Sequence, residues 1–168
     1  MRLPPVVRLL AATLVAGAVA LVPSHARASS LESEIELLRS DLKTGKLEVV
    51  KDVLHVEGTR ADAFWPLYRK YQLELDKIGD QRLALIKDYA AHYDNMTDEK
   101  AKTLVKQSLD LASQRTDLLK KYYKDFEKVL GSTDAARLIQ VEHLIMALVD
   151  VQLGAEIPLI EHTAGKPE

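Results

Sequence analysis

A seven-residue repeat of large apolar side chains constrains the fold of this chain more than any other feature. It runs in two adjoining rows, Phe64, Tyr71, Ile78 and Leu85 in one and Tyr68, Leu75, Arg82 and Tyr89 in the other. Side chains spaced three, four and seven residues apart lie on one face of an α-helix. The pattern predicts a helix from about Thr59 to Tyr93 with a bundle-type seam, interrupted only at Arg82.

A second long pattern predicts a partner for this helix, from about Asp98 to Leu130. Its apolar positions follow a three-four rhythm: Val105, Leu109, Ala112, Thr116, Leu119, Tyr123, Phe126 and Leu130. Thr97 is expected to cap the helix, and Gly131 to end it in the left-handed conformation. At a rise of about 1.5 Å per residue both helices would be about 50 Å long. Joined by a four-residue turn, they would form a long antiparallel hairpin.

Shorter helices are expected on both sides of the hairpin. One is predicted at about Lys46 to Leu54, and one from Ser132 or Thr133 to about Leu153. The second is apolar on most sides, which predicts burial from several directions, within the monomer or in a dimer. Almost no alternating apolar pattern occurs. The predicted fold class is therefore all-α, a helical bundle built on a long antiparallel helical hairpin with shorter flanking helices.

Two threonines and one proline are expected to shape the ends of these helices. Thr59 is predicted to cap the first long helix, and Thr133 (or Ser132) the last one. Pro66 lies inside the first long pattern and has no N–H to donate to the carbonyl of Asp62. A kink or a later start of the helix is expected there.

The first 28 residues have the pattern of an export signal. Arg2 and Arg8 precede an apolar run of about 14 residues, and Ala26-Arg27-Ala28 forms a small-x-small cleavage site. A membrane-spanning helix needs about 20 apolar residues, so a signal cleaved after Ala28 is favoured over an anchor. The predicted location is the periplasm, without stable membrane insertion after cleavage; an uncleaved signal at the inner membrane is the alternative.

Cleavage would leave 140 residues, which is enough for one domain. We expect a helical or frayed arm at 29–45, a helical domain at 46–160 and a disordered tail at 161–168. The signal holds three of the 23 basic residues and none of the 25 acidic ones, so the mature net charge is −5. An acidic exported chain is a poor candidate for nucleic-acid binding. There is no cysteine for disulfides, thiolate catalysis or cysteine zinc sites.

The sequence contains no recognisable catalytic or metal-binding motif. His55, His92, His143 and His162 lack the spacing that places two imidazoles on one helical face, and no Glu-x-x-His pair of the di-iron type occurs. Glu142-His143 is a single adjacent pair, for which a partly exposed histidine is the favoured interpretation. Gly-rich phosphate loops and the Gly-x-Ser-x-Gly elbow are also missing. We therefore predict a protein that is not an enzyme and has no cofactor.

An aromatic cluster on the first long helix is the candidate site for binding a partner. It consists of Phe64, Trp65, Tyr68 and Tyr71. Trp65, the only tryptophan, is interpreted as a core or dimer anchor rather than part of a ligand cage. If the cluster lies outside the core, it forms an apolar patch of the kind that marks interaction sites.

Two segments give the chain a resemblance to a known family. Gly58-Thr59-Arg60-Ala61-Asp62 and Ser132-Thr133-Asp134-Ala135-Ala136 resemble the two L-T-x-x-Q motifs of the Spy/CpxP-like periplasmic proteins. Both segments keep the threonine, neither keeps the leucine, and Asp62 and Ala136 stand in place of the glutamine. The chain is also similar, in Phe64-Trp65-Pro66-Leu67-Tyr68, Tyr89-Ala90 and Ile157-Pro158-Leu159, to a bacterial group of exported helical proteins without a settled role.

The Spy/CpxP-like resemblance implies a cradle-shaped dimer that binds unfolded or partner proteins, or tempers an envelope stress sensor, without ATP. The leading hypothesis is therefore an exported protein that acts by protein binding, chaperone-like or stress-modulating, with unfolded or specific envelope proteins as partners and a homodimer as its state. The alternatives are a structural or adaptor oligomer of the cell envelope and a ligand- or metal-responsive sensor domain.

Overall fold

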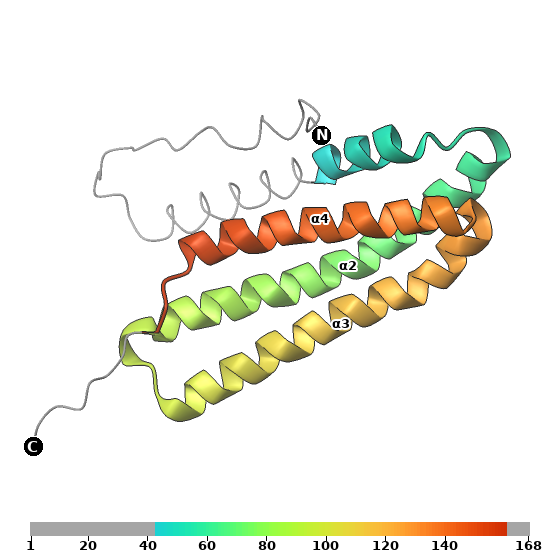
Figure 1. Cartoon of the computed structure of the whole chain (residues 1–168). Helices are drawn as coiled ribbons and strands as arrows, with labels where there is room; N and C mark the ends of the chain where they lie inside the picture. The colour runs from blue at the N-terminus through green and yellow to red at the C-terminus, as the bar shows by residue number, and fades with distance from the viewer. Residues whose placement is uncertain (1–42, 161–168) are drawn as a thin grey trace, which may run out of the picture. The chain divides into compact units, whose positions relative to one another are not determined.

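The computed structural model of the protein describes residues 43–160, and every regular element within that range is helical (Figure 1). The predicted all-α class is confirmed, as is a bundle built on a long antiparallel hairpin. Three predictions lie outside the described residues: the signal with its cleavage site, most of the arm at 29–45, and the tail at 161–168.

The described residues belong to two compact units, 43–55 and 56–160, whereas the helical domain was expected to begin at residue 46. In the first unit, residues 43–54 form a helix in which Val50 and Leu54 are buried. The helix ends at Leu54, and the next residue, His55, has a positive φ of 47° and donates its N–H to the carbonyl of Lys51 (3.1 Å). Glycine is the usual residue in this conformation, so histidine is strained there.

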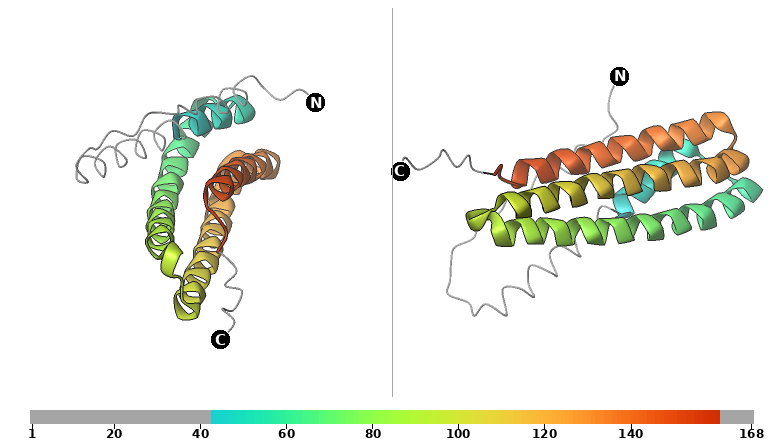
Figure 2. Two further views of the ribbon diagram at one scale, coloured as in Figure 1. Left: turned by 90° about the vertical axis from the view of Figure 1, so that its left-hand side faces the viewer. Right: turned by 90° about the horizontal axis from the view of Figure 1, so that it is seen from below.

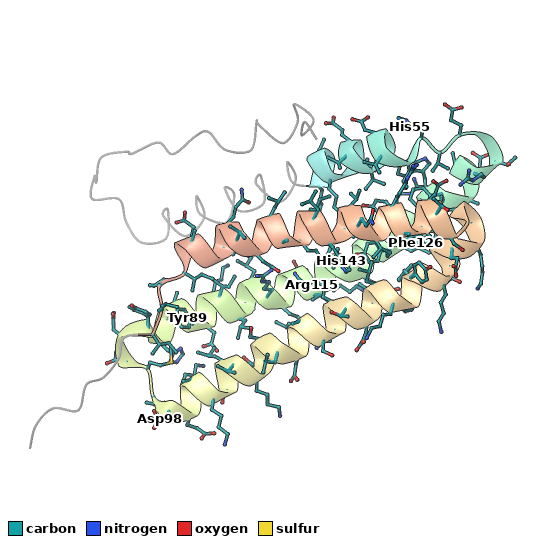
Figure 3. The ribbon with its side chains drawn as sticks, in the orientation of Figure 1. His55, Tyr89, Asp98, Arg115, Phe126 and His143 are labelled. Carbon is teal, nitrogen blue, oxygen red and sulfur yellow. The ribbon has the colours of Figure 1, made fainter. Side chains whose placement is uncertain are left out.

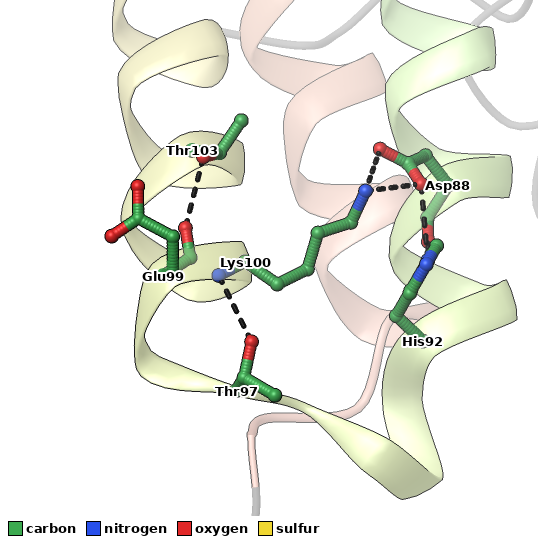
Figure 4. A network of polar contacts seen from close by, with 6 residues as sticks. All are labelled: Asp88, His92, Thr97, Glu99, Lys100 and Thr103. Carbon is green, nitrogen blue, oxygen red and sulfur yellow. Dashed lines mark hydrogen bonds and ion pairs between the residues drawn. The ribbon is translucent and has the colours of Figure 1, made fainter.

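Two long helices form the hairpin of the second unit. They are α2 (Gly58–His92) and α3 (Asp98–Leu130), joined by the short 3₁₀ helix η2 (Tyr93–Asn95). Thr97 caps α3 as predicted, because its hydroxyl oxygen accepts the backbone N–H of Lys100 (3.2 Å). The Lys100 ammonium reaches back to Asp88 of α2 (2.7 Å), and His92 contacts the same carboxylate (3.1 Å) (Figure 4). The Lys100–Asp88 pair holds the two helices together beside the turn, while the His92–Asp88 contact lies within α2.

The last helix, α4 (Ser132–Glu156), runs back alongside α3 (Figure 2). A single residue, Gly131, separates the two helices, and its N–H donates to the carbonyl of Glu127 (2.9 Å). The predicted positive φ is present at 79°, but ψ is 162°, so the residue is not in the left-handed helical region. This combination of angles is essentially restricted to glycine.

The two predicted threonine caps are wrong. Helix α2 begins one residue before Thr59, with Glu57 at the N-cap position, and α4 begins at Ser132 with Gly131 there; neither has a side-chain cap hydrogen bond. The hydroxyl of Ser132 instead donates to the carboxylate of Glu127 (2.9 Å). In both cases the helix starts too early for the threonine to stand outside it.

Pro66 does not delay the start of α2. The helix is continuous through it, although the carbonyl of Asp62 loses its intrahelical partner. Both Asp62 and Pro66 are exposed. Water can therefore satisfy this carbonyl, which lowers the cost of a proline at this position.

Burial is concentrated at one end of the α2–α3–α4 unit. This packed end consists of 64–71 of α2, 118–130 of α3 and 135–142 of α4, and it contains all the buried side chains of the unit except Leu104. The loose end consists of 78–92 of α2, 98–115 of α3 and 144–156 of α4. In Figure 3, Phe126 marks the packed end and Tyr89 the loose end. The seam predicted on α2 is divided in the same way. Its residues at the packed end, Phe64 and Tyr71, are buried, whereas Ile78 and Leu85 at the loose end are half-buried.

Candidate protein-binding site

The aromatic cluster predicted as a binding face lies mostly in the core. Phe64, Tyr68 and Tyr71 are 0%, 2% and 0% exposed, and Trp65 is half-buried. Phe126 of α3 packs against the cluster. Its ring centroid lies 5.9 Å from that of Phe64, with the rings tilted, and 5.7 Å from that of Tyr71, with the rings edge to face. Since α3 covers these rings, the expected open patch is not formed. The other interpretation of Trp65, as part of a core, agrees better with this placement.

A carboxylate whose role the sequence analysis did not predict lies beside this cluster. Glu142 of α4 is fully buried, and its two oxygens accept hydrogen bonds from the hydroxyls of Tyr68 and Tyr71, both at 2.9 Å. Burial raises the pKa of both tyrosines, and the neighbouring Glu142 charge raises it further. Both hydroxyls therefore remain protonated donors. The sequence did contain a signal for this link: a lone glutamate in an apolar stretch of α4, together with two tyrosines three residues apart on α2.

The buried Glu142 joins α4 to α2 rather than offering a reactive group. A substrate has no access to a carboxylate with no exposed surface. A buried carboxylate is costly unless donors satisfy it, and the tyrosines supply two. His143, its neighbour in the sequence, is exposed, as its favoured interpretation predicted.

A second polar link explains the interruption of the seam at Arg82. Asp150 of α4 accepts hydrogen bonds from Arg82 of α2 (2.6 Å) and from Arg115 of α3 (3.0 Å), so one carboxylate connects three helices. Burial alone would raise the pKa of Asp150, but the hydrogen bonds and charges of the two arginines outweigh it and hold this pKa below its ordinary value. The three groups border a cleft of about 170 Å³ between Ile78, Leu85 and Leu111.

The helix α4 has an apolar surface on the side away from these links. Leu144, Leu148 and Val151 are 52%, 42% and 72% exposed. Positions 144, 148 and 151 share one helical face, whereas Glu142 and Asp150 project to the inner side. We call Leu144, Leu148 and Val151 the outer face of α4. The sequence analysis expected this helix to be buried from several directions, and within the described residues its outer face is uncovered.

An apolar groove lies at the loose end, between α2 and α3. It has a volume of about 210 Å³, and the segment after α4 closes it on one side. The lining residues are Leu85, Ile86, Tyr89, Ala101, Leu104, Val105, Ser108, Ile157 and Ile160. Two tyrosine hydroxyls hold that segment in place. Tyr89 donates to the carbonyl of Pro158 (2.6 Å), and Tyr93 donates to that of Leu159 (3.1 Å).

Among residues 43–160, no group of three or more His, Cys, Asp or Glu side chains is placed to hold a metal ion. In the same range one helix, α4, is long and apolar enough to cross a membrane by length and composition. In this structure α4 packs along α3, and its two inner carboxylates are bonded to tyrosines and arginines of the neighbouring helices.

No family model, curated protein or solved structure matches this chain.

Proposed function

We propose that the mature chain is an exported, periplasmic protein that acts by binding other proteins, with the outer face of α4 as the contact surface. Export rests on the signal pattern of residues 1–28. Binding rests on the exposure of Leu144, Leu148 and Val151, which form an apolar row on one helical face. Adjoining apolar side chains on a surface rimmed by polar residues mark interaction sites.

The inner side of α4 supports this role. Glu142 is bonded to two tyrosines and Asp150 to two arginines, so both halves of the helix are attached to the hairpin. The outer face is therefore presented on a rigid element, and binding requires little reordering of α4. Burial of apolar surface is non-directional, which suits partners of varied sequence. Unfolded envelope proteins, bound without ATP, are the partners that this surface favours.

The same outer face favours one competing function, a structural oligomer of the envelope. Two copies can cover each other's α4, and a helix that is apolar on most sides is typical of such a contact. In a permanent oligomer the face is unavailable to clients. The two functions therefore differ in whether the face is free under working conditions.

Aggregation suppression by the mature chain, residues 29–168, tests the proposal, with light scattering in the same buffer. We expect the wild-type protein to suppress aggregation of an unrelated unfolding protein at near-stoichiometric ratios. The variant Leu144→Asp/Leu148→Asp should lose this activity while keeping its helicity, since surface substitutions usually change stability by no more than about 0.5 kcal/mol.

Leu73→Asp is the matched control, because Leu73 of α2 is 63% exposed and outside the outer face. It should suppress aggregation as the wild type does. Equal activity in all three proteins would contradict the proposal. A stable wild-type oligomer without activity, reduced to a monomer by Leu144→Asp/Leu148→Asp, would support the structural function instead.

A vesicle flotation assay separates protein binding from membrane insertion. We expect the mature chain to remain unbound, because insertion of α4 would remove Glu142 and Asp150 from their partners. Flotation with vesicles that resists a salt wash would contradict this expectation.

A further inference from the structure

The segment after α4 lies along the apolar groove of the loose end and closes one side of it. Ile157 has φ −93° and ψ 114°, and α4 ends at the preceding residue. Ile157 and Ile160 both line the groove; Ile157 is half-buried and Ile160 is 48% exposed, whereas Leu159 between them is 88% exposed. A spacing of three residues places two side chains on the same side of a polyproline II segment, the open conformation that Pro158 favours.

The hydrogen bonds of this segment go to its main chain. Tyr89 of α2 and Tyr93 of η2 are four residues apart, and their rings pack edge to face with centroids 5.8 Å apart. Their hydroxyls bond two successive carbonyls, those of Pro158 and Leu159. Main-chain bonds provide affinity that does not depend on the side chains, while the apolar surface that receives the anchoring side chains provides selectivity.

We propose that this groove is a peptide-binding site for extended apolar segments of other proteins, and that residues 157–160 occupy it as an internal substitute. The preferred ligand is an extended segment with two aliphatic anchors three residues apart, as in Ile-Pro-Leu-Ile. Proline suits the second position because it has no N–H that would need a partner. The inference goes beyond the proposed function, since it places a second binding surface in the groove and names the class of segment that is bound there.

The internal segment acts as a competitor for external peptides. An external peptide gains access only in the fraction of molecules whose own segment has left the groove, and its apparent affinity falls by that fraction. The segment is tied down by two tyrosine hydroxyls and two isoleucines. Its removal should therefore raise the affinity for a peptide of the same sequence.

Fluorescence anisotropy with a labelled peptide of residues 154–160 (Gly-Ala-Glu-Ile-Pro-Leu-Ile) tests this inference on the mature chain. The variant Ile157→Asp/Ile160→Asp should bind the peptide about tenfold more tightly than the wild type, as expected if the internal segment occupies the groove about nine-tenths of the time. Addition of Tyr89→Phe to this variant should weaken binding about two- to tenfold through loss of one hydrogen bond.

Addition of Val105→Asp should abolish binding, because Val105 lines the groove and is 55% exposed, so its replacement leaves the fold intact. A peptide with aspartate in place of both isoleucines is the matched negative control. Equal affinity of the wild type and Ile157→Asp/Ile160→Asp would overturn the inference, as would binding that survives Val105→Asp. A concentration-dependent dimer that Ile157→Asp/Ile160→Asp abolishes would overturn it too, by assigning the groove to the segment of a second copy.

The outer face of α4 separates this inference from the proposed function. Leu144→Asp/Leu148→Asp should leave peptide binding unchanged and abolish only the suppression of aggregation. Peptide binding without any suppression of aggregation by the wild type would contradict the proposed function of the outer face alone. Suppression without peptide binding would contradict the groove alone.

Discussion

The two ends of the α2–α3–α4 unit are built from the same three helices but differ in what holds them together. At the packed end, aromatic rings and a buried carboxylate fill the space between the helices. At the loose end, half-exposed aliphatic side chains surround clefts, and charged pairs such as Asp150 with its arginines provide much of the contact. Under the proposed function, stability and binding lie in different parts of the helices, because a surface that binds a partner has to remain uncovered.

Truncation of one large apolar side chain at each end should give the largest contrast. Phe126→Ala removes a ring with no exposed surface that contacts four other aromatic rings, and we expect a loss of about 3–5 kcal/mol in the free energy of unfolding. Leu109→Ala removes a side chain that is 66% exposed and should cost no more than about 0.5 kcal/mol. Urea denaturation of both variants measures this difference. Similar losses would contradict the division into two ends.

The second contrast concerns the buried carboxylate. Glu142→Ala leaves the hydroxyls of Tyr68 and Tyr71 without these acceptors, and each buried unsatisfied group costs about 1–3 kcal/mol. Glu142→Gln should lose less, because its amide oxygen still accepts a hydrogen bond. Thermal unfolding followed by circular dichroism compares the two variants. A larger loss in Glu142→Gln than in Glu142→Ala would contradict the role of the carboxylate as an acceptor.

The same substitution of glycine should have opposite effects at the two ends. Gly131 has a positive φ of 79°, so Gly131→Ala forces a strained backbone and should destabilise the protein by about 1–2 kcal/mol. Gly154 lies inside α4 with open space around it, and Gly154→Ala should stabilise the protein by about 0.5–1 kcal/mol through better helix propensity. Melting temperatures measured side by side show the signs. A stabilising Gly131→Ala would refute the proposed strain.

The smallest effect is expected from the charged link at the loose end. Asp150→Asn weakens the bridge to Arg82 and Arg115, but the Asp150 side chain is 38% exposed, so solvent screening limits the loss to about 1 kcal/mol or less. Because the pKa of Asp150 is lowered in the folded protein, the bridge stabilises above the ordinary value of 3.8 and is lost as the pH falls below it. The difference between wild type and Asp150→Asn should therefore disappear in acid. A difference that is independent of pH would contradict this assignment.

Most of the fold was predictable from local patterns. The bounds of α3 agree with those expected, and the hydroxyl of Thr97 caps it as foreseen. The two other threonine caps were predicted wrongly, because α2 and α4 begin one residue before Thr59 and at Ser132. The start of a helix depends on one capping residue, and contacts with neighbouring elements outweigh the local preference of that residue. Where α3 meets α4, Arg60 of α2 donates hydrogen bonds to the carbonyl of Leu130 (2.6 Å) and to the carboxylate of Asp134 (2.8 Å).

The candidate site was less predictable than the fold. The aromatic residues Phe64, Tyr68 and Tyr71 were expected to form a binding surface if they lay outside the core, and α3 covers them. Exposure depends on which helix packs against a face, and the periodicity of one helix contains no information on its neighbour. The outer face of α4 and the groove at the loose end became recognisable only once the helices were placed together.

The sequence by itself determined that this chain is helical, where its long helices run and which residues share a face, because these properties depend on interactions between residues three or four positions apart. Tertiary structure alone decided the partners of Glu142 and Arg82, the burial of the aromatic cluster and the exposure of α4. Each of these joins residues far apart in the chain, such as Tyr71 and Glu142, whose distance is set by how whole helices pack and not by the pattern along any one of them.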